Sequence, residues 1–589
     1  MAKFAVILQE GPATAREERL GRILEFFGIP WRAVGASDLE TLNAEPGECA
    51  AFGPVRAVAA ALQAAPHLGS AGRRFAAFYA YLGDDRQEDE PALRSLPSLT
   101  NASLQIPPAQ EHSVVVSSGL AAFAGPMSGL EVSLRLGEGD FFLGGAGAGE
   151  NAGYLPIVSA GGSPVFFRCQ SQGVDVFVCT SSRMIDVDAP LGRRFYDVKE
   201  HFCSVVPLVM FIRSTFPEVA WHPQELGACL IIDDPLLKPR YGFCDFPSLQ
   251  ALMKGHEFST NISFIPWNWR RTSPSAAEFF RNHSDFFSVS IHGCDHTAGE
   301  FGAPSVDVLN ARARLAQSRM RDHEARTGIH HDPVMVFPQG VFSSQCPEVL
   351  KRNGFLAAVN TETVPVDSQN SRTRIRDVWD VAITSYGGFP VFTRRYAFHG
   401  VENFAFDLLL GKPCLIVSHH DFFKDGGTGL LALIEKLRSM NCSLRWRSLG
   451  EVVRRACRRR ACSADTEEIQ MYGTELRIEN LSDRAIAVRV HKKECQPDLV
   501  MQVVCGDEPL NWTADQERLE FSGRISPRRE GHFKVLYREL AGNAKMSRPL
   551  KYELSVAARR FLSELRDDYL AKSPFLTAAA AKLKGAVTG

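Results

Sequence analysis

A series of short apolar segments between residues 226 and 450 constrains the fold of this chain more than any other feature. Stretches with helical spacing, such as residues 305–327, separate these segments. The segments read ACLIIDD, STNISFIPW, FFSVSIHG, PVMVFPQG, FLAAVNT, DVAITSY and CLIVSHHD. Short apolar strands that alternate with helices form a parallel sheet. At least six such strands over roughly 220 residues predict a closed or nearly closed (β/α) barrel.

The rest of the chain predicts further domains on both sides of this barrel, because 589 residues are too many for one core. A strand–helix–strand pattern opens the chain and indicates an α/β domain of flavodoxin-like or amidotransferase-like appearance. After the basic run RRACRRRACS, interpreted as a helix end or linker, alternating segments predict an antiparallel β-sandwich, followed by a helical tail. The predicted boundaries are 1–220 for the α/β domain, 221–455 for the barrel, 465–555 for the β-sandwich and 556–589 for the tail.

Composition and charge narrow the range of partners. The chain has 66 Lys and Arg against 67 Asp and Glu, so nothing in its charge favours nucleic acid or an anionic membrane. No segment approaches the roughly 18 apolar residues of a membrane span, and the N-terminus lacks the pattern of a secretory signal. The 14 cysteines are scattered singly, which is typical of reduced thiols. We therefore expect a cytoplasmic protein, whose oligomeric state the sequence leaves open.

Polar clusters follow three of the predicted barrel strands. The carboxyl ends of barrel strands meet on one face, so we expect these side chains to converge there. One aspartate with two histidines spaced four apart suits Zn²⁺ or another divalent metal and leaves positions open for water. Taken singly, a His-x-x-x-His pair arises by chance and an Asp pair can cap a helix; three clusters at strand ends favour a site. The clusters are Asp233-Asp234 after ACLII, His292 and His296 after FFSVSI, and His419-His420-Asp421 after CLIVS.

The motifs LIIDDP, SIHGCDHT, VFPQG and LIVSHHD, in this order, resemble the polysaccharide deacetylase (NodB-homology) family. The resemblance covers about residues 226–450. It implies a distorted (β/α) barrel that uses one divalent metal, commonly zinc, to remove acetyl groups from N-acetylated sugars.

The resemblance also implies a role for individual residues. Asp233 resembles the catalytic base, Asp234, His292 and His296 the metal ligands, and His419 the general acid, with His420 as a rival for that role. The chain departs from the family in three places. Pro235 replaces a glycine, no arginine precedes VFPQG, and the fourth motif has only an unclear counterpart around Trp379.

Several residues near these motifs are candidates for binding the sugar. Aromatic rings offer flat faces on which sugars stack, and arginines bind carboxylate or phosphate groups in bidentate fashion. The alternative for the tryptophans is a loop anchored on the barrel wall. A backbone N–H near Gly242 is a candidate oxyanion donor. The candidates for substrate binding are Trp267, Trp269, Arg270, Arg240, Tyr241, and the groove-lining Pro338 and Gly340.

The predicted function is that of a metal-dependent carbohydrate N-deacetylase, a hydrolase of C–N amide bonds that acts on a polysaccharide or an exopolysaccharide precursor. A first alternative is a glycoside hydrolase, for which Asp295 or Asp421 would supply the second acid. A second is a non-catalytic glycan-binding or assembly protein. Dependence on metal and release of acetate distinguish the three. The sequence leaves open which sugar, which polymer and which metal.

Overall fold

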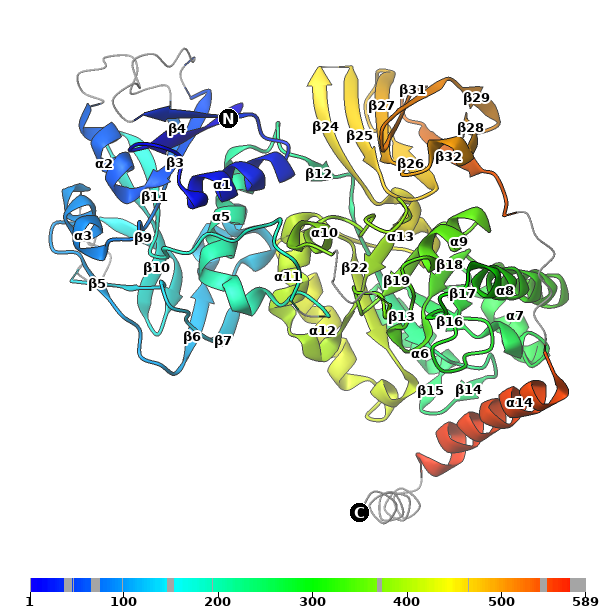
Figure 1. The fold of residues 1–589 in the computed structure, drawn as a ribbon. Helices are drawn as coiled ribbons and strands as arrows, with labels where there is room; N and C mark the ends of the chain where they lie inside the picture. The colour runs from blue at the N-terminus through cyan, green and yellow to red at the C-terminus, as the bar shows by residue number, and fades with distance from the viewer. Residues whose placement is uncertain are drawn as a thin grey trace.

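The computed structural model of the protein describes residues 2–35, 45, 47–64, 75–97, 99–145, 153–192, 194–367, 373–463, 465–540 and 548–572. These residues form an N-terminal α/β domain, a central barrel, a β-sandwich and a C-terminal helix (Figure 1). The barrel lies between the N-terminal domain and the C-terminal helix. No helix in the described ranges is both long and apolar enough to cross a bilayer. Residues 573–589 of the predicted tail lie outside the described residues.

A nine-stranded mixed sheet forms the N-terminal domain. Its first five strands run parallel to one another, and the remaining four are joined in antiparallel pairs. Helices cover both faces, and α5 (Phe202–Thr215) is apolar nearly all round because it is buried between this sheet and the barrel. In sheet order the strands are β2 (Trp31–Gly35), β1 (Phe4–Gln9), β3 (Cys49–Pro54), β4 (Phe75–Tyr81), β11 (Val174–Cys179), β10 (Ser163–Ser171), β9 (Tyr154–Ala160), β6 (Glu111–Val116) and β7 (Glu131–Arg135). The main helices are α1 (Ala15–Phe26), α2 (Val55–Ala64) and α3 (Arg86–Ser95).

Parallel strands wrapped by helices form the central domain, which confirms the predicted (β/α) barrel. The strands are buried on both faces. Strands β13 and β22 accordingly read as nearly continuous apolar runs, whereas β16 buries the polar Thr260, Asn261 and Ser263. In sheet order they are β20 (Val391–Thr393), β19 (Ala357–Asn360), β18 (Val334–Val336), β17 (Phe287–His292), β16 (Thr260–Phe264), β13 (Leu226–Asp233), β22 (Cys414–Ser418) and β21 (Arg395–Tyr396). The helices are α6 (Phe246–His256), α7 (Pro274–Asn282), α8 (Val306–Thr327), α9 (Cys346–Arg352), α10 (Ile375–Trp379), α11 (Val401–Leu410), α12 (Thr428–Arg438) and α13 (Leu449–Arg455).

The two edges of this sheet, β20 and β21, are consecutive in the chain, and only Arg394 separates them. The backbone therefore passes directly from one edge strand to the other, which makes the barrel nearly closed. The segment DVAITSY at residues 380–386, predicted as a strand, contributes only an isolated bridge between Ile383 and Val391. Its apolar side chains are buried in irregular backbone, and apolar content alone does not separate that case from a strand.

Two packed sheets after the barrel form the predicted β-sandwich. The prediction of purely antiparallel pairing is wrong at one place, since β25 and β27 are parallel. The basic run RRACRRRACS begins with Arg454 and Arg455 at the end of α13, as the prediction of a helix end has it, and then continues as strand β24 instead of a linker. Two arginines of this strand, Arg459 and Arg460, pair with acids of the neighbouring strand β25. One sheet contains β12 (His222–Pro223), β24 (Cys457–Ser463), β25 (Thr466–Met471), β27 (Ile486–Lys493), β31 (Arg518–Ile525) and β30 (Trp512–Asp515); the other contains β26 (Glu475–Glu479), β32 (Glu530–Tyr537), β28 (Val500–Cys505) and β29 (Glu508–Leu510).

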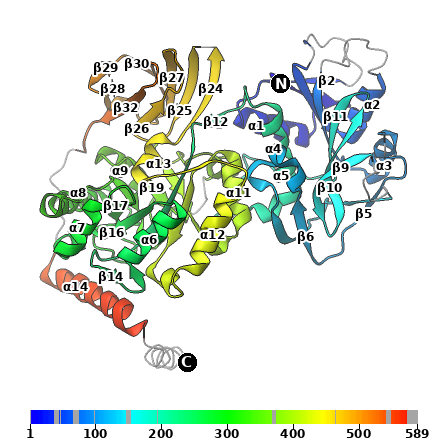
Figure 2. The same cartoon turned by 180° about the vertical axis from the view of Figure 1, so that it is seen from behind.

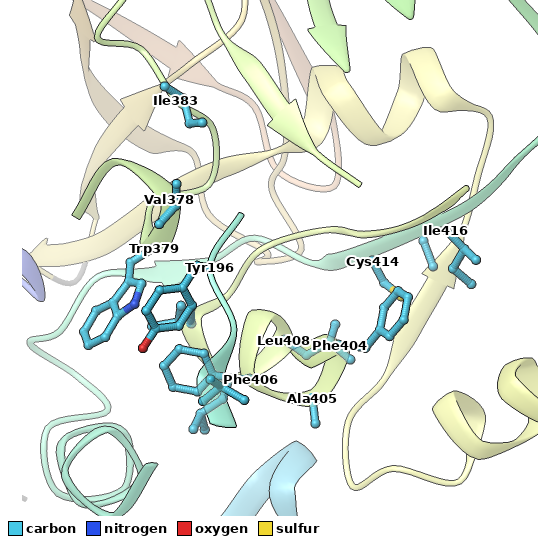
Figure 3. Close-up of a cluster of buried hydrophobic side chains, with 14 of the residues drawn as sticks. Tyr196, Val378, Trp379, Ile383, Phe404, Ala405, Phe406, Leu408, Cys414 and Ile416 are labelled. Carbon is cyan, nitrogen blue, oxygen red and sulfur yellow. The ribbon is translucent and has the colours of Figure 1, made fainter. Parts of the chain in front are cut away.

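A buried aromatic cluster ties the N-terminal domain to the barrel (Figure 3). Tyr196, from the segment between β11 and α5, packs edge-on against Trp379 of α10 with ring centroids 6.1 Å apart. Its ring also stacks near Phe406 of α11. Trp379 is 1% exposed, so this residue of the candidate fourth motif belongs to the core. Large buried aromatics dominate interface energetics, which fixes the two domains against each other.

The last described elements of the chain are helix α14 (Leu550–Leu565) and the π-helical turn that continues it at Arg566–Leu570. The two opposite views in Figures 1 and 2 both place α14 across the barrel near β14 (Arg240–Tyr241) and α7. Hydrogen bonds join it to the loops that follow several barrel strands. This end of the barrel is the end at which the predicted site residues lie.

Candidate metal centre and active site

The two adjacent aspartates lie at the carboxyl end of β13, in the middle of the barrel sheet. Asp233 is the last residue of the strand and is 3% exposed. Asp234 has a φ of +79°, in the left-handed region that residues other than glycine seldom adopt. The turn directs the Asp233 carboxylate to an arginine and the Asp234 carboxylate to two histidines. Such local backbone strain is frequent at functional sites.

The structure brings Asp234, His292 and His296 together at one point. One potential ligand atom from each lies within 4.8 Å of the other two. The Nε2 atoms of His292 and His296 are 3.4 and 3.0 Å from Asp234 Oδ1. His292 is the last residue of β17. His296 has a φ of +55°, so it shares the left-handed backbone conformation of Asp234. The arrangement matches the predicted ligand set residue by residue.

This donor set fits a divalent metal. Asp234 Oδ1 is buried without a hydrogen-bond partner, which leaves a carboxylate oxygen free for a cation. His292 Nδ1 lies 3.0 Å from the Val336 carbonyl oxygen, which only accepts, so Nδ1 carries the proton and Nε2 keeps its lone pair. A carboxylate and two imidazoles are the donors that zinc and similar metals accept.

Glu300 holds the loop that carries His296, and sequence reasoning missed it. Its carboxylate accepts the backbone N–H groups of Cys294, Asp295 and His296 at 2.8, 3.0 and 3.1 Å. These three backbone hydrogen bonds to the buried Glu300 carboxylate stabilise the left-handed turn at His296. The signal in the sequence was weak, because a lone Glu four residues after a histidine has no motif around it.

Arg394 is the second residue that sequence reasoning missed. From the junction of β20 and β21 its guanidinium donates to both carboxylate oxygens of Asp233, at 2.8 and 2.7 Å. Both side chains are 4% exposed. Burial would raise the pKa of Asp233, but the charge of Arg394 outweighs it and holds the pKa below its ordinary value.

The two adjacent histidines after β22 have different surroundings. His419 Nε2 lies 4.0 Å from Asp233 Oδ2, and its side chain is 35% exposed beside the ring of Tyr396. His420 turns away and lies 3.3 Å from Asp567 of the C-terminal turn, with 12% of its side chain exposed. Of the two rivals for the general acid, His419 is the one next to the aspartate pair.

The tryptophans predicted to bind sugar lie on the loop after β16. Trp267 and Trp269 are half-buried, and Arg270 is stacked on Trp269 with its guanidinium carbon 4.4 Å from the ring centroid. Trp267 packs against Phe561 of α14 at a centroid distance of 6.3 Å. The rings therefore contribute partly to holding the helix, in line with the alternative of an anchored loop.

The remaining candidates for substrate binding are engaged within the protein. The exposed side chain of Arg240 donates to Asp245, and the buried Tyr241 hydroxyl donates to Asp567 at 2.8 Å. The N–H of Gly242, a candidate oxyanion donor, donates instead to Asp568 Oδ1 at 2.6 Å. The two groove-lining candidates have tight neighbours: Pro338 packs against Gly293, and Gly340 has a φ of +69° beside Glu362.

Helix α14 forms one side of this site. Glu564 pairs with Lys238 and Arg271, which lie in the loops after β13 and β16. Tyr552 donates to Asp295 at 2.8 Å in the loop after β17. The helix contacts leave Asp234 and His419 with 26% and 35% of their side chains exposed, so the site keeps access to solvent. Nothing in the helical composition of the tail indicated this position.

Comparisons with known proteins find partial likeness in structure. No protein-family model matches the chain. No curated protein matches it in sequence.

Three solved structures illustrate this likeness. A family 4 carbohydrate esterase from Streptomyces lividans shares 13% identity over 36% of this chain and 85% of its own, at a TM-score of 0.22. A family 4 acetyl xylan esterase from Clostridium thermocellum shares 13% identity over 38% and 89%, at 0.24. A β-galactosidase from Bacillus circulans sp. alkalophilus shares 14% over 31% and 28%, at 0.20. At such identities and TM-scores these likenesses carry no weight for the activity of this chain.

Proposed function

We propose that this protein is a metal-dependent hydrolase that removes acetyl groups from N-acetylated sugars of a polysaccharide or glycan precursor. One observation carries the proposal. A cluster that can bind a divalent metal, Asp234 with His292 and His296, adjoins a second carboxylate, Asp233, which Arg394 keeps ionised. A base beside a metal position is the arrangement that metal-assisted hydrolysis of an amide uses.

A metal bound by these three residues would supply a Lewis acid that polarises the acetyl carbonyl and lowers the pKa of water. Two side chains of the protein then carry out the two proton transfers of the reaction. Asp233, ionised and fixed in orientation by two hydrogen bonds from Arg394, accepts the proton of the attacking water. His419, 4.0 Å from Asp233 and partly exposed, is positioned to protonate the departing amine. Glu300 and the Val336 carbonyl orient the two histidines.

The alternative of a glycoside hydrolase is less well supported by the carboxylates. Such enzymes need two accessible acids across the scissile bond. Asp295 is 1% exposed, and Arg319, Arg548 and Tyr552 occupy its two oxygens. Asp421 is exposed on the turn that follows His419, outside the buried cluster around Asp233. Neither supplies the second acid for Asp233.

Acetate release by the full-length protein tests the proposal. The metal-loaded protein is expected to release acetate from N-acetylhexosamine oligomers, to stop on chelation and to recover when zinc is restored. The Asp234→Ala variant should show no release. Chelation that leaves hydrolysis of the glycosidic bond intact would favour the glycoside hydrolase. A protein that binds glycans but releases neither acetate nor shorter sugars would favour a binding role.

A further inference from the structure

The C-terminal helix carries one charged side chain that faces the site without a carboxylate partner. Arg560 is 7% exposed, and its Nη2 is 3.5 Å from Nδ1 of His296. Its Nε is buried with no hydrogen-bond partner. Among the described residues it forms no ion pair. The guanidinium thus lies directly beside the proposed metal centre with most of its hydrogen-bonding capacity unused.

The other charged groups on the barrel side of this helix are paired. Arg548 bonds Asp295 and Glu553, Glu564 bonds Lys238 and Arg271, and Asp567 bonds Arg566. Among the described residues of this segment, Arg560 is the buried charged side chain that has no ion pair. A buried charge without a partner lowers stability, and proteins retain such groups mainly where a ligand supplies the missing charge.

The nearby acids do not fill this role. Both oxygens of Glu300 already accept backbone N–H groups, three in all, and Asp234 faces the two histidines. Once Asp234 binds a cation, its charge is no longer available to Arg560. The planar guanidinium has donors in the geometry that matches carboxylate or phosphate oxygens in bidentate fashion.

We propose that Arg560 is a specificity-determining residue that binds an anionic group, carboxylate or phosphate, on the substrate. The inference rests on the proposed deacetylase function and adds a substrate class to it: an N-acetylated sugar that bears a negative charge close to its acetamido group. Asp234, which contacts the same histidine as Arg560, has 26% of its side chain exposed, so solvent reaches this part of the site.

Direct binding by the full-length, zinc-loaded protein tests the proposal without turnover. The probes are N-acetylglucosamine, N-acetylglucosamine 1-phosphate and N-acetylmuramic acid, titrated at low and at high salt; both anionic probes carry their charge on a carbon next to the acetamido-bearing one. We expect wild type to bind at least one anionic probe about tenfold more tightly than the neutral sugar, with the preference reduced by salt. The phosphate and carboxylate arms show which anion fits.

Three variants separate recognition from structure. Arg560→Gln is expected to bind all three probes alike, and Arg560→Lys to keep part of the preference. The neighbouring Arg559→Gln is the matched control and should behave as wild type. Because Arg560 has no carboxylate partner, Arg560→Gln should unfold at the same or a higher temperature, whereas a structural arginine would show the opposite.

The outcomes distinguish this inference from the function on which it rests. No preference in wild type, or a preference that survives in Arg560→Gln, overturns the role of Arg560. Acetate release from neutral and anionic probes with equal kcat/KM in wild type would leave the deacetylase standing and refute the inference. Anion binding that depends on Arg560, without any acetate release, would sustain the anion site and refute the deacetylase.

Discussion

Arg394 and Asp233 form a buried bidentate ion pair, with guanidinium-to-carboxylate distances of 2.8 and 2.7 Å, at the point where the barrel closes. This ion pair links the closure of the barrel to the proposed catalytic base. Arg394 is the single residue between the two edge strands β20 and β21, and Asp233 is the carboxylate that neighbours the metal ligands. The backbone that closes the barrel therefore also sets the charge state of the proposed base.

Replacing the base should separate metal binding from turnover. In Asp233→Asn the carboxamide cannot accept the proton of water, so we expect acetate release to fall about 100- to 10,000-fold. The metal content should stay at the wild-type level, because Asp234 and the two histidines remain. Elemental analysis and an acetate assay on the same sample check this. Activity near wild type would remove Asp233 from the role of base.

Removing the arginine should move the pH dependence of catalysis. Arg394 holds the pKa of Asp233 down, so in Arg394→Gln that pKa rises and the acidic limb of kcat/KM shifts to higher pH. The variant should also lose about 3–5 kcal/mol of unfolding free energy, since a buried carboxylate loses its partner. A pH–rate profile and urea unfolding measure the two effects. An unshifted acidic limb would contradict the assignment.

Metal binding should depend on each of the three clustered residues. We expect Asp234→Ala, His292→Ala and His296→Ala each to abolish stoichiometric zinc in native mass spectrometry. His330→Ala is the control, because that imidazole is 92% exposed and pairs with Glu324 outside the cluster. Zinc retained at one equivalent in all three variants would refute the centre.

The two adjacent histidines should differ in what they affect. His419→Gln is expected to lower kcat by about 100-fold, because it removes the proton donor for the amine. His420→Gln removes the contact with Asp567 and should act on the helix, raising hydrogen exchange in residues 550–565. Asp567→Asn is the matched variant and should raise exchange in the same segment. A larger loss of kcat in His420→Gln than in His419→Gln would reverse the assignment.

The free energy of unfolding should decrease as the pH is lowered, because of one buried histidine. His323 of α8 is 0% exposed, and burial lowers its pKa to about 4. The unfolded state has an ordinary pKa of about 6.5, so between about pH 6.5 and 4 it binds a proton that the folded state does not. The free energy of unfolding should therefore drop by roughly 3 kcal/mol over this range. His323→Gln lacks this titration, and urea unfolding of both proteins at several pH values isolates the difference. Equal pH dependence would contradict the buried, neutral imidazole.

The barrel and most of the proposed centre were predictable because they rest on short-range patterns. Apolar segments at strand length, separated by helical spacing, predict parallel strands, and parallel strands place their carboxyl ends on one face. From that rule alone Asp233, Asp234, His292, His296 and His419 were expected to converge. The strand at 380–386 and a linker within residues 454–463 were mispredicted, because apolar or basic content does not reveal whether backbone pairs with a neighbour.

Only the tertiary structure decided which distant charges meet. Arg394 is 161 residues from Asp233 in the chain, and Arg560 is 264 residues from His296. A contact between residues so far apart in the chain leaves no periodic trace in the sequence, since each side chain alone is an ordinary surface-type residue. Their partners are set by the closure of the barrel and by the path of the last helix across it. The sequence by itself thus determined the fold class and the ligand types, and three-dimensional packing determined their electrostatic surroundings.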